Sequence, residues 1–216
     1  FCDDNKVWVT TFTGGVSWID RQTSSVHHIT HNSNNHNSLI NNDVNNIIED
    51  QKSNIWMATN NGISRWNVAN NKWYTYISDK QDQSKVFLAL CEDSNGNMWA
   101  GTYSSGVYVL DGDTGKILYH YFKDIKFVSD IYKDTQGNIW IGGPNSVVVY
   151  LEKEKRFQSY GHFPLCTFQE LSSDIMLLGC TYGLIALDKH TGTTEMLVHN
   201  YLIKDILILK DDVWIA

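Results

Sequence analysis

The sequence lacks the features of a nucleic-acid-binding, membrane-spanning or metal-binding segment. Its 17 Lys and Arg residues are outnumbered by 24 Asp and Glu residues and form no cluster, whereas binding of nucleic-acid phosphates needs a basic face. The longest apolar runs, such as 206–209, are as long as a strand and too short for a membrane helix. The four cysteines, Cys2, Cys91, Cys166 and Cys180, lack the paired spacing of a metal site, and their disulfide status stays open.

Proline is also scarce, so the turns must be made by other residues. Only Pro144 and Pro164 are present, while fifteen glycines and abundant Asn and Asp can form turns instead. Hydrophobic residues make up 42% of the chain and charged residues 19%, which predicts a folded domain with a substantial core. No signal peptide is visible in the sequence, which begins at Phe1 as if within a strand, so we expect a trimmed terminus.

A tryptophan that follows a turn recurs along the chain, and this repeat decides the fold class. The copies succeed one another every 37 to 48 residues, and Leu177 occupies the tryptophan position in one of them. We expect the tryptophans to fill the space between neighbouring sheets as structural anchors of the repeat. These anchors are Trp8, Trp56, Trp99, Trp140 and Trp214.

Each copy predicts four short strands. An apolar run ends in an acidic pair such as Glu92-Asp93, a turn rich in Asn and Gly follows, and the tryptophan strand comes next. A glycine-containing turn leads to a third strand such as 107–111, and another turn leads to a fourth such as 118–121. Short β-branched and aromatic strands at even spacing predict an antiparallel meander.

We therefore predict an all-β fold, a β-propeller, because a meander can bury both faces only between copies of itself. A β-sandwich is the alternative, but it has no reason to repeat turn chemistry and tryptophan together. Residues 1–216 would form a single propeller fragment of four complete four-stranded antiparallel blades and two partial terminal blades, whose open edges favour a larger ring. The predicted limits are 1–39 (partial), 40–85, 86–124, 125–164, 165–204 and 205–216 (partial).

The repeat resembles a known family, the two-component regulator propeller repeat. Its consensus, apolar-x-Glu-Asp-x-x-Gly-Asn-Ile-Trp-x-Gly-Thr-x-x-Gly-apolar, is fullest at residues 92–102. The resemblance covers nearly the whole chain and is strongest around Trp56, Trp99 and Trp140. It implies a piece of a seven-bladed propeller from the periplasmic sensor region of a hybrid two-component system of the Bacteroidetes type.

The resemblance also implies a function. Such systems join propellers to a membrane helix, a histidine kinase core and a receiver, and many respond to glycan fragments by switching on polysaccharide-utilisation genes. We therefore expect a non-catalytic, oligosaccharide-sensing, periplasmic module whose parent chain is a sensor histidine kinase. The expected partners are the remaining blades and a second copy in a homodimer, with the membrane reached only through downstream chain. No cofactor is expected.

The chain offers no convincing catalytic or metal site of its own. His27, His28, His31 and His36 fall in or beside an Asn- and Ser-rich stretch that predicts a solvated loop, so we expect no metal there. The acidic pairs recur at one place in the repeat, which favours turn capping over acid–base catalysis.

A ligand would instead bind on the face formed by the loops between the second and third strands. An aromatic ring can stack on the C–H face of a sugar while amides bind its hydroxyl groups. The alternatives are a protein-interaction scaffold and, less favoured, a propeller lyase or glycosidase. The candidate ligand-binding residues are Phe12, Asn60, Asn61, Tyr103, Ser104, Asn145 and Tyr182.

Overall fold

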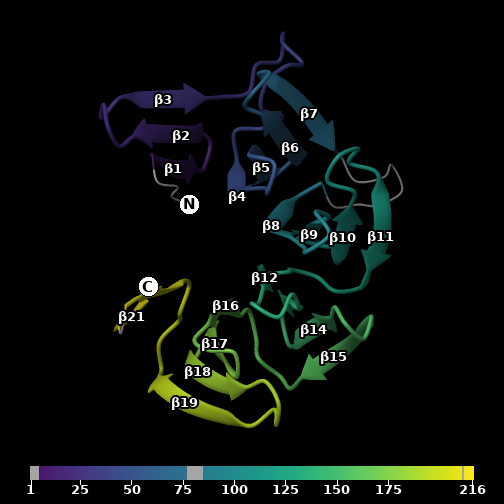
Figure 1. The fold of residues 1–216 in the computed structure, drawn as a ribbon, viewed down its shortest axis with the longest axis vertical. Helices are drawn as coiled ribbons and strands as arrows, with labels where there is room; N and C mark the ends of the chain where they lie inside the picture. Colours follow the sequence, from purple (N-terminus) through teal and green to yellow (C-terminus); the bar gives the residue numbers. More distant parts are fainter. Residues whose placement is uncertain (1–4, 77–84, 211) are drawn as a thin grey trace.

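The computed structural model describes residues 5–76, 85–210 and 212–216, and there the strands form six antiparallel sheets. The sheets follow one another around an open arc, with strands β4, β8, β12 and β16 toward its centre (Figure 1). The predicted all-β propeller fold is therefore confirmed, with four four-stranded sheets between two smaller ones. No helix in the described ranges has the length and apolarity needed to cross a membrane.

We number the sheets as blades 1 to 6 in chain order. Blade 1 contains β1 (Lys6–Thr11), β2 (Gly15–Asp20) and β3 (Val26–Ile29). Blade 2 contains β4 (Val44–Glu49), β5 (Asn54–Thr59), β6 (Gly62–Asn67) and β7 (Lys72–Tyr76). Blade 3 contains β8 (Phe87–Glu92), β9 (Met98–Thr102), β10 (Val107–Leu110) and β11 (Ile117–Tyr121).

The remaining blades repeat this order from the inner strand outward. Blade 4 contains β12 (Asp130–Lys133), β13 (Ile139–Gly142), β14 (Val147–Leu151) and β15 (Arg156–Tyr160). Blade 5 contains β16 (Thr167–Glu170), β17 (Ile175–Cys180), β18 (Gly183–Asp188) and β19 (Thr194–His199). Blade 6 contains β20 (Ile206–Leu209) and β21 (Asp212–Ile215).

The repeated aspartate holds the first hairpin of each regular blade together. In blade 3, Asp93 Oδ1 accepts hydrogen bonds from the backbone N–H of Asn95 (2.8 Å) and of Asn97 (2.9 Å). Its Oδ2 accepts bonds from Asn97 Nδ2 (3.0 Å) and from the indole Nε1 of Trp99 (3.0 Å). One carboxylate thus closes the turn and supplies the acceptor that a buried indole N–H needs.

The same arrangement, which we call the Asp–Trp cage, occurs in two further blades. Trp56 Nε1 donates to Asp50 Oδ2 over 2.7 Å in blade 2, and Trp140 Nε1 donates to Asp134 Oδ2 over 3.0 Å in blade 4. All three tryptophans are at most 3% exposed. The predicted role of the acidic pair in turn capping is therefore observed, together with an indole contact that the turn pattern did not suggest.

A glutamate at the end of an inner strand joins its blade to the preceding one. Glu92 accepts the backbone N–H of Gln51 in blade 2 over 2.9 Å, and Glu170 accepts that of Thr135 in blade 4 over 2.8 Å. Glu170 also binds the ammonium group of Lys189, which is buried and lies 3.5 Å from Asp134. These contacts tie the cage turns of blades 2 and 4 to the blades that follow them.

Apolar side chains from adjacent blades form the core between the sheets. Trp140 and Val149 of blade 4 pack with Phe168, Met176 and Leu178 of blade 5. Trp99 of blade 3 lies in the corresponding cluster with blade 4, and Trp8 lies between blades 1 and 2. The tryptophan strand of one blade is therefore covered by the next blade, as the repeat predicts.

Blade 5 is the exception, because it has lost both partners of the cage. Leu177 replaces the tryptophan, and Leu171 stands six residues before it, where blades 2, 3 and 4 have aspartate. Leu177 is fully buried and packs with Leu184, Ile203 and Ile206. Replacing both partners by apolar residues leaves no buried donor without an acceptor.

The terminal blades leave apolar surface exposed. Trp214 on β21 is 61% exposed, and Leu207, Leu209 and Val213 are also exposed. Trp8 on β1 and Trp214 on β21 occupy the same place in the repeat, that of the second strand of a four-stranded blade, and these strands belong to different sheets at the two ends of the arc (Figure 1). Trp214 is thus an anchor residue with no neighbouring blade over it among the described residues.

Loss of one cage should destabilise the chain strongly. In Asp93→Ala the indole of Trp99 and the backbone N–H of Asn97 stay buried without an acceptor, and we expect a loss of about 3 kcal/mol in unfolding free energy. Asp113→Ala is the control, because Asp113 forms an exposed ion pair with Lys52 and should cost less than about 1 kcal/mol. Urea unfolding of both variants measures the difference, and equal losses would contradict the cage.

The leucine pair of blade 5 suggests a double-mutant cycle. Asp93→Leu and Trp99→Leu should each destabilise, but the double variant should lose about 1–3 kcal/mol less than their sum, because neither partner is left alone. Chemical denaturation of the four proteins gives the coupling energy. The matched cycle of Trp56→Leu with Asp134→Leu, in blades that are not adjacent, should be additive. Additivity in the first cycle would show that the indole and the carboxylate act independently.

Candidate functional site

The structure places the seven predicted ligand-binding residues in the loops between second and third strands. Phe12, Tyr103 and Tyr182 expose 78%, 53% and 37% of their surface. They lie one loop per blade around the arc, so the fold separates them instead of gathering them into one pocket. The loops are β1–β2 with Phe12, β5–β6 with Asn60 and Asn61, β9–β10 with Tyr103 and Ser104, β13–β14 with Asn145, and β17–β18 with Tyr182.

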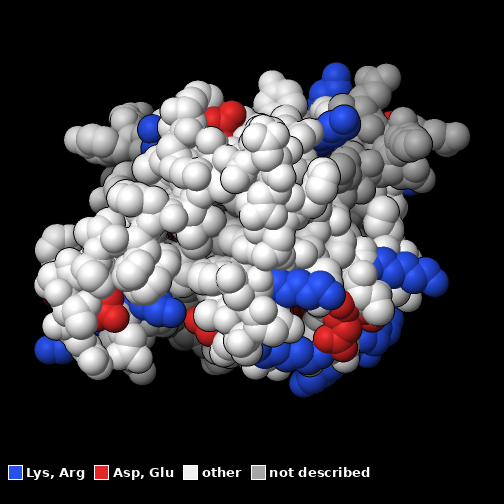
Figure 2. Space-filling model, turned by 90° about the horizontal axis from the view of Figure 1, so that it is seen from above, with Lys and Arg blue, Asp and Glu red and all other residues white. Residues whose placement is uncertain are grey.

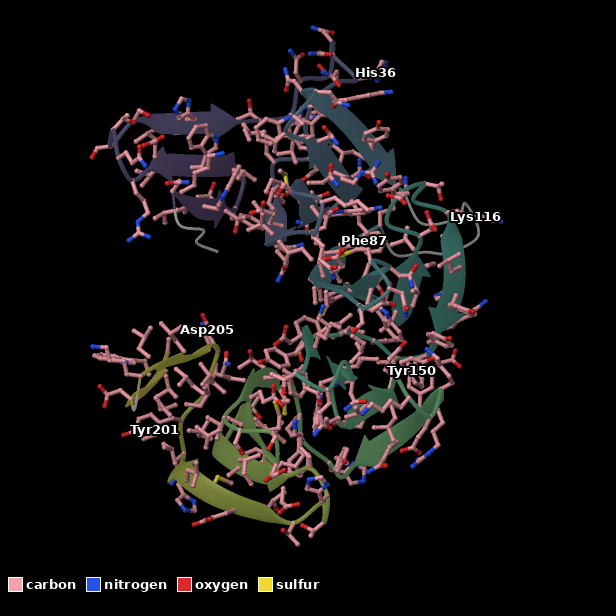
Figure 3. The ribbon with its side chains drawn as sticks, in the orientation of Figure 1. His36, Phe87, Lys116, Tyr150, Tyr201 and Asp205 are labelled. Atoms are coloured by element: carbon pink, nitrogen blue, oxygen red, sulfur yellow. The ribbon has the colours of Figure 1, made fainter. Side chains whose placement is uncertain are left out.

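A cavity of about 670 Å³ lies instead along the inner side of the arc. The first strands and the blade-to-blade connections of blades 2 to 6 form its wall, which the sequence prediction did not include. We call it the inner cavity. Figure 3 shows Phe87 and Asp205 on the inner side of the arc, and His36 and Lys116 on its outer side. The polar and aromatic lining of the inner cavity includes Asn45, Asn46, Phe127, Ser129, Asp130, Tyr132, Thr167, Gln169, Lys204 and Asp205.

One predicted residue, Tyr103, reaches the inner cavity through an aromatic neighbour. Its ring lies edge-to-face on Phe127, with ring centroids 5.6 Å apart, and the Phe127 N–H donates to the Tyr103 carbonyl over 2.7 Å. Phe127 lines the cavity and is 37% exposed. The pair therefore presents a partly exposed aromatic surface at the cavity rim.

A second predicted residue, Asn60, is linked to the cavity by an amide. Asn45 lines the cavity, and its Nδ2 donates to Asn60 Oδ1 and to the Phe87 carbonyl, each over 2.8 Å. Asn60 in turn donates to Asp43 over 3.3 Å. The adjacent Asn46 has a buried side-chain oxygen with no hydrogen-bond partner in the described part of the chain.

Asp130 is a partly buried carboxyl group in the lining. It accepts hydrogen bonds from the Thr167 hydroxyl (3.0 Å) and the Phe168 N–H (3.1 Å) of blade 5. Removal from water raises the pKa of the Asp130 carboxyl, and the negative charge of Asp205 adds to the rise, while the bond from Phe168 opposes it. The inner cavity thus combines carboxyl, hydroxyl and amide groups beside an aromatic pair.

The histidines of the Asn- and Ser-rich stretch contact aromatic, hydroxyl and carbonyl groups. His27 stacks on Trp18 at 3.8 Å, His28 shares a hydrogen bond with Ser17, and His31 Nδ1 lies 2.7 Å from the Leu39 carbonyl. In the described ranges no cluster of three or more His, Cys, Asp or Glu residues could hold a metal ion. The acidic pair Asp3/Asp4 lies outside the described residues.

Charge on the molecular surface is mixed. Figure 2 shows one face on which Lys and Arg lie beside Asp and Glu along the lower margin, next to a broad area without charge. The basic surface that a nucleic-acid backbone would require is not seen on this face.

Sequence reasoning missed the inner-cavity residues because it considered only one set of loops. Phe127, Asp130, Thr167 and Asp205 lie in or just after connections between blades, whose lengths vary and which the repeat consensus does not cover. One signal was present: an Asp followed by Ile stands at the start of β12 (Asp130) and directly before β20 (Asp205).

Comparisons with known proteins agree with the propeller fold. No curated protein matches the sequence. The extracellular domain of a putative hybrid two-component system from B. thetaiotaomicron superposes with a TM-score of 0.82 at 22% identity, covering 98% of this chain and 30% of that chain. The extracellular domain of a putative one-component system from the same organism gives 0.78 at 17% identity, covering 100% and 32%. This chain therefore spans about a third of these domains.

A third similar structure, virginiamycin B lyase from Staphylococcus aureus, has a TM-score of 0.78 at 15% identity, covering 100% of this chain and 75% of that chain. At such identities the likeness shows the fold alone. The match of the sequence to a family model is more specific than the structural likeness. The family model of the two-component regulator propeller matches residues 38–61, 80–104 and 124–145, the segments that contain Trp56, Trp99 and Trp140. Three segments of the chain are thus two-component regulator propeller repeats, and they supply the first two strands of the consecutive blades 2, 3 and 4.

Proposed function

We propose that the chain is a ligand-sensing propeller module of a hybrid two-component system, located in the periplasm, and that its ligand is an oligosaccharide. The observation that carries the proposal is the inner cavity with the Tyr103–Phe127 pair at its rim. The regulator repeats, and the likeness to extracellular domains of such systems, support the sensor role.

The lining suits a sugar for physical reasons. An aromatic ring covers the C–H face of a pyranose, while amide, carboxyl and hydroxyl groups replace the water around its hydroxyl groups. Phe127 supplies the ring, and Asn45, Thr167 and Asp205 supply the polar groups. A strongly anionic ligand fits less well, because the lining has carboxyl groups of Asp130 and Asp205 beside one ammonium group, that of Lys204.

Signalling would follow from a shift between two arrangements of the parent protein. A ligand moves such an equilibrium only by the difference between its affinities for the two states. The lining comes from five blades, so a ligand that contacts several of them favours one spacing of the blades. In the proposed parent, a sensor histidine kinase acting as a homodimer, that spacing would reach the kinase through chain outside this segment and control polysaccharide-utilisation genes.

A protein-interaction scaffold is the second candidate, and the outer strand β11 favours it. Ile117, Leu118 and Tyr119 are 38%, 40% and 57% exposed there, and an exposed apolar stripe of this kind can bind a partner protein. Tyr119 lies on the last strand of blade 3, whereas Tyr103 precedes the third strand of the same blade. One blade therefore offers a matched pair of tyrosines to separate the two functions.

Substitution at the cavity rim should weaken sugar binding. Phe127→Ala and Tyr103→Ala should each lower the affinity for a bound oligosaccharide roughly 3- to 10-fold, because an aromatic contact contributes about 0.5–1.5 kcal/mol. A thermal-shift screen of oligosaccharides finds the ligand, since a ligand that binds only the folded state raises Tm. Calorimetry on the wild type and the variants then gives the affinities.

Tyr119→Ala is the control and should bind the same oligosaccharide with unchanged affinity. Equal binding by Phe127→Ala, Tyr103→Ala and the wild type would remove the inner cavity as the site. If no oligosaccharide raises Tm, and Tyr119→Ala alone loses a purified partner protein, the scaffold function replaces the sensor function.

A further inference from the structure

Two of the cysteines face each other inside blade 5. Cys166 directly precedes β16 and Cys180 ends β17, and because Thr167 pairs with Gly179 in the antiparallel register, the two cysteines lie opposite each other. Their sulfur atoms are 2.7 Å apart, and both side chains are fully buried. The Cys166 carbonyl accepts the Ser129 hydroxyl of blade 4, and the Cys180 carbonyl accepts the Ile203 N–H from the connection to blade 6.

We propose that Cys166 and Cys180 form a disulfide bond that cross-links the first and second strands of blade 5. Residues directly opposite each other on antiparallel strands have Cα atoms about 4.5–5.5 Å apart, which lies within the range that a disulfide spans. The backbone bonds to blade 4 and to the connection with blade 6 hold both cysteines in place on either side. Neither sulfur has to move far for the bond to form.

The same position in other blades shows what the cross-link replaces. Cys180 stands three residues after Leu177, where blade 2 has Thr59 and blade 3 has Thr102. Those threonine hydroxyls donate to the carbonyl groups of Gly62 (2.8 Å) and Gly106 (2.9 Å) and so tighten the next turn. In blade 5 this hydroxyl is absent.

Blade 5 is also the four-stranded blade without an Asp–Trp cage. The cage closes the turn at one end of the first hairpin, and the cysteine pair lies at the other end of the same two strands. A covalent bond there compensates for the hydrogen bonds of the Asp–Trp cage, which this hairpin lacks.

The chemistry is an ordinary thiol–disulfide exchange. Each thiol loses a proton, the sulfur–sulfur bond forms, and the two electrons pass to the disulfide of a thiol–disulfide oxidoreductase, whose bond breaks to give two thiols. Burial of both sulfurs means that oxidation takes place before blade 5 closes, and that the folded blade then protects the bond. Such bonds form and persist in oxidising compartments.

Cys91 provides an internal comparison. It lies on β8, where burial raises the pKa of its thiol to about 12, so it is a poor thiolate nucleophile in the folded chain. Cys2 lies outside the described residues. A correct pairing therefore links Cys166 with Cys180 and leaves Cys91 as a thiol.

Differential alkylation tests the pairing. The chain, exported to an oxidising compartment and purified without reductant, is denatured and treated with N-ethylmaleimide, then reduced and treated with iodoacetamide. Peptide mass mapping should find the first label on Cys91 and the second on Cys166 and Cys180, with a linked peptide before reduction that is two hydrogens lighter. The first label on Cys166 and Cys180, or a link from either to Cys2 or Cys91, would overturn the proposal.

The stabilising effect is measured on the same material. The bond closes a loop of 14 residues, so a reductant should lower Tm by roughly 6–12 °C. Cys91→Ser should keep this shift, and the double variant Cys166→Ser/Cys180→Ser should have a low Tm that no longer responds to reductant. A wild-type Tm that stays constant after the bond has been opened would contradict the stabilising role. Neither readout depends on a sugar ligand, so the result is independent of the sensor function.

Discussion

The buried bond between a tryptophan indole and an aspartate carboxylate is the constraint on which this structure depends. A tryptophan large enough to fill the gap between two sheets brings a polar N–H with it, and that N–H needs an acceptor once it is buried. Asp50, Asp93 and Asp134 supply the acceptor and bind the backbone of the turn at the same time. The large aromatic side chain can therefore be buried without an unsatisfied donor, and the blades can pack closely.

The cage also bears on how neighbouring blades are joined and on how blade 5 differs from the other four-stranded blades. Glu92 and Glu170 bind the turns of the preceding blades, which are blades 2 and 4. A cage holds each of these two turns in shape. In blade 5 the two polar partners are replaced together by Leu171 and Leu177. The inner cavity lies on the central side of this framework, and the cages of blades 2 and 4 fix the first strands that carry lining residues such as Asn45 and Asp130.

Much of the fold followed from the sequence, because turn residues and short runs of β-branched and aromatic residues are local signals. The strands around Trp56, Trp99 and Trp140, and the capping role of the acidic pair, needed no knowledge of distant contacts. The indole contact, the opposition of Cys166 and Cys180, and the placement of Phe127 beside Tyr103 depend on strand register and on connections of variable length. The candidate site was therefore only partly predicted: Tyr103 and Asn60 reach the inner cavity through neighbours, while Phe12, Asn145 and Tyr182 lie on other loops.

Hydrogen exchange of the indole N–H groups, followed by NMR, tests the central role of the cage most directly. The indole protons of Trp56, Trp99 and Trp140 should exchange only through unfolding of their blades, whereas that of the exposed Trp214 should exchange within the dead time. Exchange of the Trp99 and Trp140 indoles as fast as that of Trp214 would show that the carboxylates do not hold them, and would contradict this account.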